Sequence, residues 1–486
     1  MHTTISWRSA ALGLVTLLVA LLAVLVVNTV LTTSHQTAAV APVDTPPRDS
    51  AAPRRLATAI TFRTVSSGTT AADRETFRAF HEFLREAFPG VHDRLIRTEI
   101  SGSSVLFEWM GRDPAARPVL LLAHQDVVPV LDAEAWTEPP FAGAIADGYV
   151  WGRGAMDDKS SLMGLLEAVE QLLADDFQPA RTVYLAFGHD EETGGEGARE
   201  VAAYLGRRGV KLEFVLDEGG FVADGLIPGV AAPIALVGIA EKGYLTVELT
   251  SEEEGGHSSR PPAHTAIGNV SRAVARLEEH PFPARLDGAA EQLFVTLAPH
   301  LPFGQRFAIA NRWLLEPVLL SALTSDPSTA TLVRTTTAPT MFRAGEKDNV
   351  LAPRATATVN LRILPGDTVD GTLARIRRII DDPRVEVRAL IAIEPSPTSS
   401  TTSPSWALLG GTIGEVLGDD VIVAPWLMVA GTDSRHFVPI ADDVYRFFAL
   451  TVTPQDVARF HGVDERISLG DYANVIAVYR RLLENL

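Results

Sequence analysis

The stretch Val-Leu-Leu-Leu-Ala-His-Gln-Asp at residues 119–126 decides the fold, because an apolar, strand-prone run ends directly in metal-ligand side chains. The pattern returns twice along the chain, as VYLAFGHDEE at residues 183–192 and as FVLDE at residues 214–218. A single imidazole or carboxylate pair would mean little. Imidazoles and carboxylates that recur at the ends of successive strands predict a two-metal hydrolytic centre.

Helix-like segments alternate with these strands. Residues 74–88 are amphipathic with helical spacing, and residues 162–173 and 198–205 are also expected to be helical. This alternation predicts an α/β fold, with a mixed, mostly parallel sheet and helices on both faces. Ligands in such sheets gather at the carboxyl ends of the strands, which is where the polar clusters fall.

A different pattern begins after residue 240. Its elements follow the order β-α-β-β-α-β, which predicts an inserted, ferredoxin-like α+β lid domain. They are expected at residues 243–250, 264–277, 336–342, 355–364, 369–380 and 385–391. An apolar, helix-prone insertion at residues 282–328 interrupts them.

The α/β pattern returns after a Ser/Thr/Pro-rich linker at residues 395–405. A strand is expected at residues 421–424 and a terminal helix at residues 469–483. We therefore expect a discontinuous catalytic domain interrupted by the lid, with the three parts at residues 56–240, 241–395 and 396–486.

The N-terminus carries a long apolar run. No residue from Ala10 to Leu31 is charged, and at roughly 1.5 Å per residue a helix of this length crosses a hydrocarbon core. Arg8 precedes the run, which keeps the N-terminus cytoplasmic and the catalytic domain outside the cytoplasm. Residues 1–34 are therefore predicted to be a membrane anchor, followed by a flexible stalk at residues 35–55. The alternative is a secreted protein whose signal peptide is cleaved at the small residues Ala39-Val40-Ala41.

The composition of the chain limits which partners it can bind and which side chains can hold a metal. The 486 residues have a formal net charge of -18, which argues against nucleic acid and against a basic membrane-binding face. A membrane is therefore expected to be reached through the N-terminal helix only. The chain contains no cysteine, so any metal must be held by imidazoles and carboxylates.

Two clusters suit a metal and the residue that orients its ligand. His124 and Asp126 are two apart at a strand end, so Asp126 can fix the tautomer of a ligating imidazole. Asp157 follows the glycine turn Gly152-Arg153-Gly154 and can project as a carboxylate that bridges two cations. The alternatives are a buried His beside a capping Asp, and an Asp157-Asp158 pair that caps the next helix.

Three further carboxylates follow strands. Of the neighbours Glu191 and Glu192, one can ligate metal while the other acts as a general base toward water. Asp217 is delivered by the end of the next strand. A solvated acidic loop and a plain helix cap are the competing interpretations.

The remaining candidates lie later in the chain. His257 sits in the glycine-rich turn GGHSSRPP of the inserted domain, where it is either a mobile donor to a developing oxyanion or an exposed loop residue. His436 and His461 compete as the second metal imidazole. Arg435 is suited to bidentate binding of a carboxylate.

Taken jointly, these motifs resemble the dizinc aminoacylase/carboxypeptidase family of metallopeptidases, in particular its carboxypeptidase S and N-fatty-acyl-amino-acid synthase/hydrolase members. The resemblance runs from about Thr61 to the C-terminus. The motifs that carry it are LLAHQDVVPV, WGRGAMDDKSSL, GHDEETGG, LDEGG, GGHSSRPP, GTDSRHF and RFHGVDERIS.

The resemblance implies a role for each candidate residue. One zinc would be bound by His124 and Asp217, the other by Glu192 and His461, with Asp157 bridging them. Glu191 would be the base and Asp126 the partner that orients His124. His257 and Asn349 would complete the site from the lid, while Arg435 would bind the substrate carboxylate.

The expected function is therefore zinc-dependent hydrolysis of an amide or peptide bond next to a free C-terminal carboxylate. The substrate would be a small peptide or an N-acyl amino acid, and the cofactor two Zn²⁺ per chain, with Co²⁺ or Mn²⁺ as alternatives. An N-acyl-amino-acid synthase that runs the reaction in reverse and a non-catalytic ligand-binding relative stay open. The lid is also a candidate homodimer surface.

Overall fold

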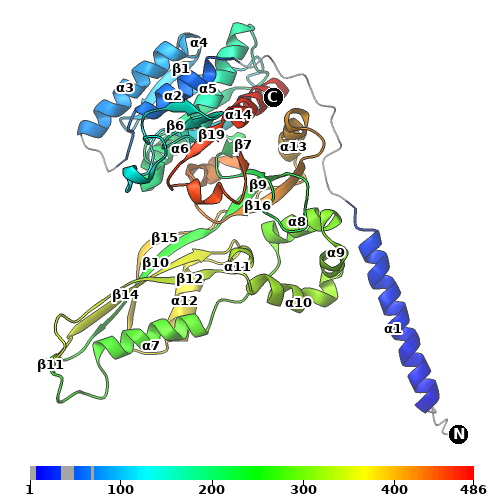
Figure 1. Ribbon diagram of the computed structural model, residues 1–486, viewed down its shortest axis with the longest axis vertical. Helices are drawn as coiled ribbons and strands as arrows, with labels where there is room; N and C mark the ends of the chain where they lie inside the picture. Colours follow the sequence, from blue (N-terminus) through cyan, green and yellow to red (C-terminus); the bar gives the residue numbers. More distant parts are fainter. Residues whose placement is uncertain (1–6, 34–48, 67–70) are drawn as a thin grey trace.

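The main sheet organises the molecule (Figure 1). The computed structural model describes residues 7–33, 49–66 and 71–486. Its 10-stranded sheet has the order β1-β2-β6-β3-β7-β17-β9-β8-β18, with β16 paired to β9. The strands are β1 (Ile96–Ile100), β2 (Ser104–Trp109), β3 (Val119–His124), β6 (Val183–Gly188), β7 (Leu212–Asp217), β8 (Phe221–Ala223), β9 (Ile234–Glu241), β16 (Ile422–Met428), β17 (Ala441–Arg446) and β18 (Thr451–Val452).

The sheet is mixed and mostly parallel, as predicted. β3 runs parallel to both β6 and β7, and β17 is parallel to β7, whereas the β1–β2 hairpin and the β8–β9 pair are antiparallel. The neighbouring strands β6, β3 and β7 are buried along their whole length or nearly so, as expected where helices cover both faces of the sheet. In register, His124 pairs with Gly188, so the end of β3 lies beside the residues that follow β6.

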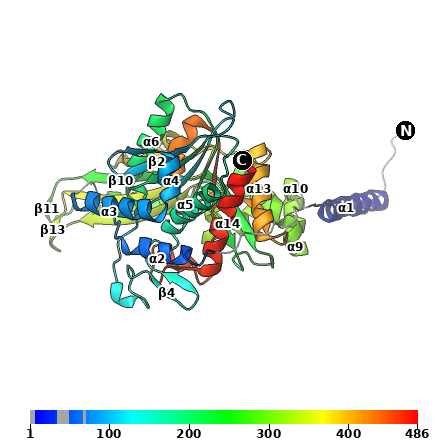
Figure 2. The same ribbon diagram turned by 90° about the horizontal axis from the view of Figure 1, so that it is seen from above.

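Helices cover the two faces of this sheet (Figures 1 and 2). On one face, α5 (Lys159–Ala174) packs with α14 (Leu469–Asn485), α2 (Ala52–Thr61) and α4 (Pro89–Arg94). On the other face lies α6 (Glu196–Arg207), whose Val201 and Leu205 pack on Leu120 and Leu122 of β3. The predicted α/β fold is therefore confirmed. Further helices are α3 (Ala71–Ala87) and α13 (Pro404–Leu417), and a small sheet joins β19 (Arg466–Ser468), β5 (Tyr149–Trp151) and β4 (Ala144–Ala146).

The stalk prediction is wrong at its C-terminal end. Residues 34–48, with the proposed cleavage site Ala39–Ala41, lie outside the described residues. At the end of the predicted stalk, however, α2 has already begun, and Leu56 of this helix is fully buried. Arg55 donates from Nε to Glu167 Oε1 at 2.6 Å. Burial of one apolar helix face and this ion pair hold the segment on the catalytic domain.

The inserted domain has the predicted ferredoxin-like fold. Its 4-stranded antiparallel sheet has the order β12-β14-β10-β15, and Leu245, Val247 and Val359 pack beneath two helices. The elements are β10 (Gly243–Glu252), α7 (Ala266–Glu279), β12 (Thr336–Ala344), β14 (Arg354–Ile363), α12 (Val369–Ile380) and β15 (Glu386–Ile393). At its far tip, β11 (Gly256–His257) pairs with β13 (Val350–Leu351).

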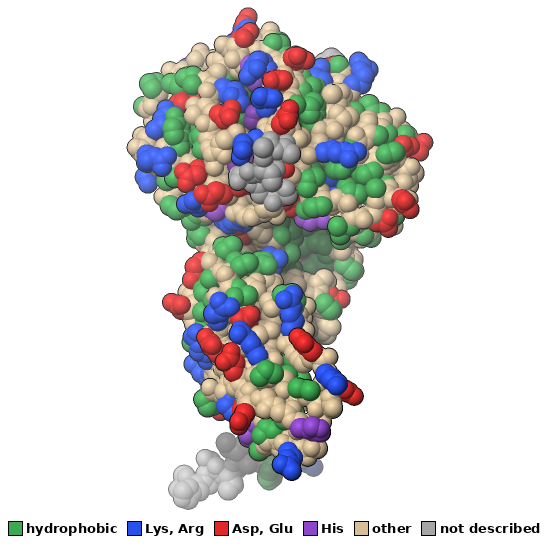
Figure 3. Space-filling model, turned by 90° about the vertical axis from the view of Figure 1, so that its left-hand side faces the viewer, with side chains coloured by type: hydrophobic (Ala, Val, Ile, Leu, Met, Phe, Trp, Pro, Cys, Tyr) green, Lys and Arg blue, Asp and Glu red, His purple; other side chains and the backbone are tan. Residues whose placement is uncertain are grey.

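Two adjacent connectors join this lid to the catalytic domain. Glu241 donates its backbone N–H to Ser396 Oγ at 2.8 Å, and Ser396 donates its own N–H to Glu241 O at 3.1 Å. The chain therefore enters and leaves the lid at one place. Figure 3 shows the lid as a narrower column below the broad catalytic domain.

The helix-prone insertion leaves the lid after Phe282, which is buried in the lid core. It forms α8 (Gly288–Leu297), α9 (Phe303–Ala310), α10 (Arg312–Thr324) and α11 (Pro327–Val333). Leu293 and Leu297 of α8 pack with Leu236 of β9 and Ala424 of β16. A segment inside the predicted lid range thus lies against the catalytic sheet, so the limits of the lid stay a prediction.

The predicted N-terminal helix is present as α1 (Trp7–Val30). Its residues Ala11–Val30 are long and apolar enough to cross a membrane, and only 6% of the most apolar window is buried. Figures 1 and 2 show α1 pointing away from the rest of the molecule beside α9 and α10. Such a helix is compatible with a membrane anchor and with a signal sequence.

Candidate metal centre

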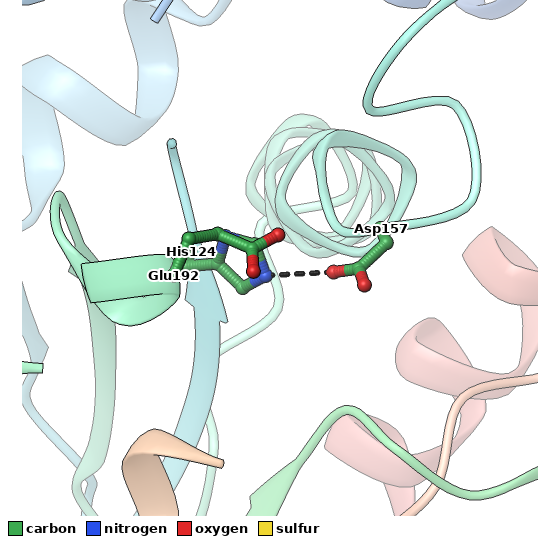
Figure 4. Close-up of side chains that lie close together, drawn as sticks. All are labelled: His124, Asp157 and Glu192. Atoms are coloured by element: carbon green, nitrogen blue, oxygen red, sulfur yellow. Dashed lines mark hydrogen bonds and ion pairs between the residues drawn. The ribbon is translucent and has the colours of Figure 1, made fainter. Parts of the chain in front are cut away.

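Three predicted ligands come together at the carboxyl edge of the main sheet. His124, Asp157 and Glu192 each offer a ligand atom, and these atoms lie within 4.8 Å of one another. Figure 4 shows His124 at the end of β3, Asp157 on the loop before α5, and Glu192 on the short turn after β6. Imidazole nitrogen and carboxylate oxygens are a donor set that suits zinc and similar divalent ions.

The imidazole of His124 is held on both sides. Its Nε2 lies 2.8 Å from Asp157 Oδ1. Its Nδ1 lies 3.0 Å from the backbone oxygen of Asp126 and 3.3 Å from Asp126 Oδ1. The same Asp126 carboxylate accepts hydrogen bonds from the backbone N–H groups of Glu191 at 3.1 Å and Glu192 at 3.2 Å. Asp126 therefore fixes the ring and the Glu191–Glu192 turn together.

Asp157 faces two imidazoles. Its Oδ2 lies 3.1 Å from Nε2 of His461, which is also 3.2 Å from Glu192 Oε1. Burial disfavours the Asp157 anion, but hydrogen bonds from His124 and His461 hold the pKa of Asp157 well below its usual range. One carboxylate oxygen for each imidazole is the geometry expected of a bridging ligand.

The capping alternative for the Asp157-Asp158 pair does not match the geometry. Asp158 occupies the N-cap position of α5, yet its side chain makes no capping hydrogen bond. Its Oδ2 instead accepts the backbone N–H of His124 at 3.2 Å. Both carboxylates of the pair therefore point to the strand end of β3 rather than to the first turn of α5.

Of the two competing histidines, the structure brings His461 to the cluster. Hydrogen bonds to Asp157 and Glu192 raise the pKa of His461 to about 10. His461 has a φ of 57°, an uncommon backbone conformation for a residue other than glycine. His436 is half-buried beside the Gly194 turn, where burial and the charge of Arg435 lower its pKa to about 4.

Asp217 lies outside the group of three but close to the same edge. Its Oδ2 accepts the backbone N–H of Ser434 at 2.8 Å, and its Oδ1 that of Glu218 at 3.0 Å. Burial, together with neighbouring negative charges, raises the pKa of a set of carboxyl groups here. They are Asp158, Glu191, Asp217, Glu218 and Asp433. So many buried carboxyl groups around two imidazoles fit a site built to hold cations.

The lid residues are not brought to this centre. His257 and Asn349 are exposed at the far tip of the lid, where Ser258 donates its N–H to Asn349 O at 3.1 Å. Ser259 donates its N–H to His257 Nδ1 at 3.1 Å. The two candidates thus lie together on the β11–β13 pair, and they reach a ligand in the centre only if the lid moves or another chain supplies them.

Arg435 lies next to the turn that carries the candidate base. Its Nη2 donates to Gly194 O at 3.0 Å, and its buried Nε has no hydrogen-bond partner. A guanidinium at the edge of an acidic site can receive an anion.

Sequence reasoning missed a buried ion pair that holds the two loops of the centre. Arg153, which is 3% exposed, pairs with the fully buried Glu465. Arg153 also donates to His461 O at 3.0 Å, while Glu465 Oε1 accepts from the N–H of Gly154 at 3.0 Å and of Met156 at 2.8 Å. Arg153 stands in the motif WGRGAMDDKSSL and Glu465 in the motif RFHGVDERIS. The opposite charges of these two residues were the one feature of the sequence that could have indicated the pair.

Asp433 was missed as well. It is buried at the start of the Arg435 loop, and its Oδ1 has no hydrogen-bond partner. Burial and the charge of Asp217 raise the pKa of Asp433 well above its usual range. It stands in the quoted GTDSRHF motif, but a lone Asp in a loop gave no reason to single it out.

Solved structures share this architecture. An M20 family metallo-carboxypeptidase from Sulfolobus solfataricus aligns with a TM-score of 0.66 and 20% identity, over 90% of this chain and 99% of that one. Human carnosine dipeptidase 1 aligns with a TM-score of 0.62 and 15% identity, over 89% and 95%. The fold is therefore that of lid-bearing metallopeptidases, and the site described above fits a metal-dependent hydrolase.

The sequence comparisons give the family. The model of Peptidase family M20/M25/M40 matches residues 120–485. The probable carboxypeptidase S-like 2 of Dictyostelium discoideum is 42% identical over 439 residues, 89% of this chain and 84% of that protein. The human N-fatty-acyl-amino acid synthase/hydrolase PM20D1 is 40% identical over 431 residues, 88% and 85%. The chain belongs to Peptidase family M20/M25/M40, and it is a metal-dependent peptidase or amidohydrolase.

Proposed function

We propose that this chain hydrolyses the amide or peptide bond next to a free C-terminal carboxylate, with two zinc ions per chain, as a carboxypeptidase or N-acyl-amino-acid amidohydrolase. The observation that supports it most is Asp157, which presents one carboxylate oxygen to His124 and the other to His461. A carboxylate that turns one oxygen toward each of two imidazoles can bridge two divalent ions. We assign His124 and Asp217 to one ion, Glu192 and His461 to the other, and Asp157 to both.

The bound ions would polarise the scissile carbonyl and lower the pKa of water. Glu191 is the proposed base. Burial and the charge of Asp433 raise the pKa of Glu191 well above its usual range. It takes the proton of the attacking water and returns it to the leaving amine. The Asp126 carboxylate holds the backbone of Glu191 in place by accepting its N–H.

Three further residues would act on the substrate. Arg435 would bind the substrate carboxylate, because an acidic cleft repels an anion unless a fixed cation receives it. His257 would donate a hydrogen bond to the developing oxyanion and Asn349 would bind the substrate beside it, once the tip of the lid approaches the centre. A small peptide or an N-acyl amino acid fits these contacts, and the names of the relatives agree with both classes.

The same site would also run the reaction in reverse. In that direction an acid and an amino acid condense, water leaves, and Glu191 carries the proton between the amine and the departing water. The printed name of PM20D1, synthase/hydrolase, favours keeping this second candidate. The non-catalytic alternative does not agree with the enzyme family to which the chain belongs. Glu191 and Asp126 are also both present, and the backbone N–H of Glu191 is bonded to the Asp126 carboxylate.

We further propose that α1 is an uncleaved anchor that places the catalytic domain outside the cytoplasm. The length of its apolar span Ala11–Val30 and the position of Arg8 before that span support this orientation. Secretion after signal cleavage is the alternative. A homodimer formed through the lid would give the exposed His257 a second route to a metal centre, that of the partner chain.

Metal removal tests the central proposal. Full-length protein in detergent is treated with a chelator, and bound metal is counted while hydrolysis of an N-acyl amino acid and a dipeptide is measured. We expect two ions per chain in active protein, loss of hydrolysis on removal, and recovery with zinc, cobalt or manganese. The variant Glu196→Gln, in an exposed side chain five residues from the base, is the control and should behave as wild type. Active protein without bound transition metal would end the proposal.

A further inference from the structure

The helix α10 has the composition of a core helix but the exposure of a surface helix. It reads RWLLEPVLLSALT, and none of its 13 residues is buried. Trp313 is 62% exposed, Val318 64%, and Phe303 of the preceding α9 60%. Large apolar side chains gathered on one exposed element mark an interaction surface. We call the exposed side chains Phe303, Trp313, Leu314 and Val318 the α9–α10 face.

The α9–α10 face is fixed beside the end of the N-terminal helix. Asn311, fully buried between α9 and α10, donates from Nδ2 to Leu25 O at 3.0 Å and lies 3.2 Å from Thr29 Oγ1. Asn28 donates from its own amide to Asn311 Oδ1 at 3.1 Å. Arg306 donates to the backbone oxygens of Val30 at 3.2 Å and Thr32 at 2.9 Å, closing the last turn of α1.

These contacts set the depth of the α9–α10 face relative to a bilayer. Leu25 lies five residues before Val30, the end of the apolar span, which is about 7 Å along a helix. If α1 crosses a membrane, Asn311 lies within about 7 Å of the boundary between hydrocarbon and headgroups. Tryptophan is enriched at this level. Each amide of the Asn28–Asn311 pair finds a partner in the other or in α1, as polar groups near hydrocarbon require.

Charge along α10 agrees with that placement. Trp313, Leu314, Pro317 and Val318 fall within about 140° of the helix circumference, and no charged residue of α10 lies in that arc. Arg312 and Glu316 lie outside it, and Arg312 Nη2 pairs with Glu291 Oε1 at 2.6 Å.

A cavity lies behind this helix. It has a volume of about 670 Å³ and is lined mainly by apolar side chains, among them Leu293, Leu297, Leu319 and Trp426. The cavity lies between α10 and the catalytic sheet, and Val318 of the α9–α10 face also lines it, so the cavity reaches the exposed side of the helix. A hydrocarbon partner suits both the apolar lining of the cavity and the exposed apolar side of this helix.

We propose that α9 and α10 lie in the surface of the bilayer that α1 crosses, with the α9–α10 face in contact with lipid and the cavity behind α10 open to lipid acyl chains. This proposal rests on the proposed anchoring by α1. It does not depend on the reaction that the metal centre catalyses.

The absence of cysteine allows a direct test. Val318→Cys and Phe303→Cys are made in the full chain, labelled with an environment-sensitive fluorophore, and reconstituted in phosphatidylcholine vesicles. Leu131→Cys, 97% exposed on the catalytic domain, is the control. We expect spin-labelled lipid to quench both α9–α10 labels strongly, and aqueous iodide to quench them several-fold less than the Leu131 label.

Equal iodide quenching at positions 318 and 131 would overturn the proposal. Amide hydrolysis is measured on the same samples. Inactive protein with lipid-quenched labels contradicts the proposed reaction alone, and active protein with water-exposed labels contradicts the membrane contact alone.

Discussion

Replacing Glu465 by glutamine should loosen the metal centre without touching a proposed ligand. The Glu465 carboxylate pairs with buried Arg153 and accepts the backbone N–H groups of Gly154 and Met156, the residues that lead into Asp157. Arg153 in turn holds the backbone oxygen of His461. One ion pair therefore positions the loops of two proposed ligands, although it contacts neither ligand side chain.

The structure sets the size of the effect. Removing one partner of a buried ion pair costs about 3–5 kcal/mol, because the other charge is left without compensation. A glutamine keeps an oxygen for Gly154 and Met156, so we expect the lower end, about 3 kcal/mol, in the metal-free protein. Residues that orient metal ligands typically change metal affinity by about 10–100-fold when mutated, and a loss of this size is expected here.

Two measurements on the full-length protein check this prediction. Urea unfolding of the metal-free forms gives the free-energy difference, and competition with a zinc chelator gives the affinity difference. Glu196→Gln, which removes an exposed ion pair with Arg199, is the matched control and should change neither quantity. An unfolding free energy within about 1 kcal/mol of wild type, combined with an unchanged chelator midpoint, would refute the reasoning.

Three further predictions concern the proposed catalytic groups. Glu191→Gln should keep bound metal but lower kcat by roughly 10²–10⁴-fold, whereas Glu192→Gln should weaken metal binding. Metal analysis and kinetics distinguish the two variants. If Glu191→Gln lost metal and Glu192→Gln kept it, the two roles would be reversed. His257→Ala should lower kcat far more than it raises KM, since an oxyanion donor acts mainly in the transition state, and an unchanged kcat contradicts that role. Wild type should cleave an N-acyl amino acid and largely refuse its C-terminal amide, and Arg435→Lys should lose about 2–5 kcal/mol of this preference. Equal wild-type rates on acid and amide would remove the argument for Arg435.

Local patterns predicted the parts of the site that strand ends deliver. His124 and Asp217 each follow an apolar run, and the structure has β3 and β7 ending at these two residues. The lid elements were also predictable, because each strand and helix carries its own period and α12 has the predicted bounds.

Contacts between distant segments could not be predicted in this way. The choice between His436 and His461, the Arg153–Glu465 pair and the packing of α8 on β16 all depend on residues far apart in the chain. A helix period shows which side of a helix is apolar, but not which sheet covers it. Helix α8 of the insertion therefore lies inside the predicted lid range in sequence but packs on the catalytic domain.

The lid is attached to the catalytic domain at one place, the two adjacent connectors at Glu241 and Ser396, so it can rotate there as a rigid body. β10 has 10 residues, an arm of about 33 Å at the usual strand rise, so a rotation of about 10° at the connectors moves its far end by roughly 6 Å. A small change in the backbone dihedral angles of the connectors would thus move His257 several ångströms through solvent. If this lid motion limits turnover, its rate should fall as the viscosity of the solvent rises. Turnover should therefore fall with added sucrose while the affinity for metal stays constant.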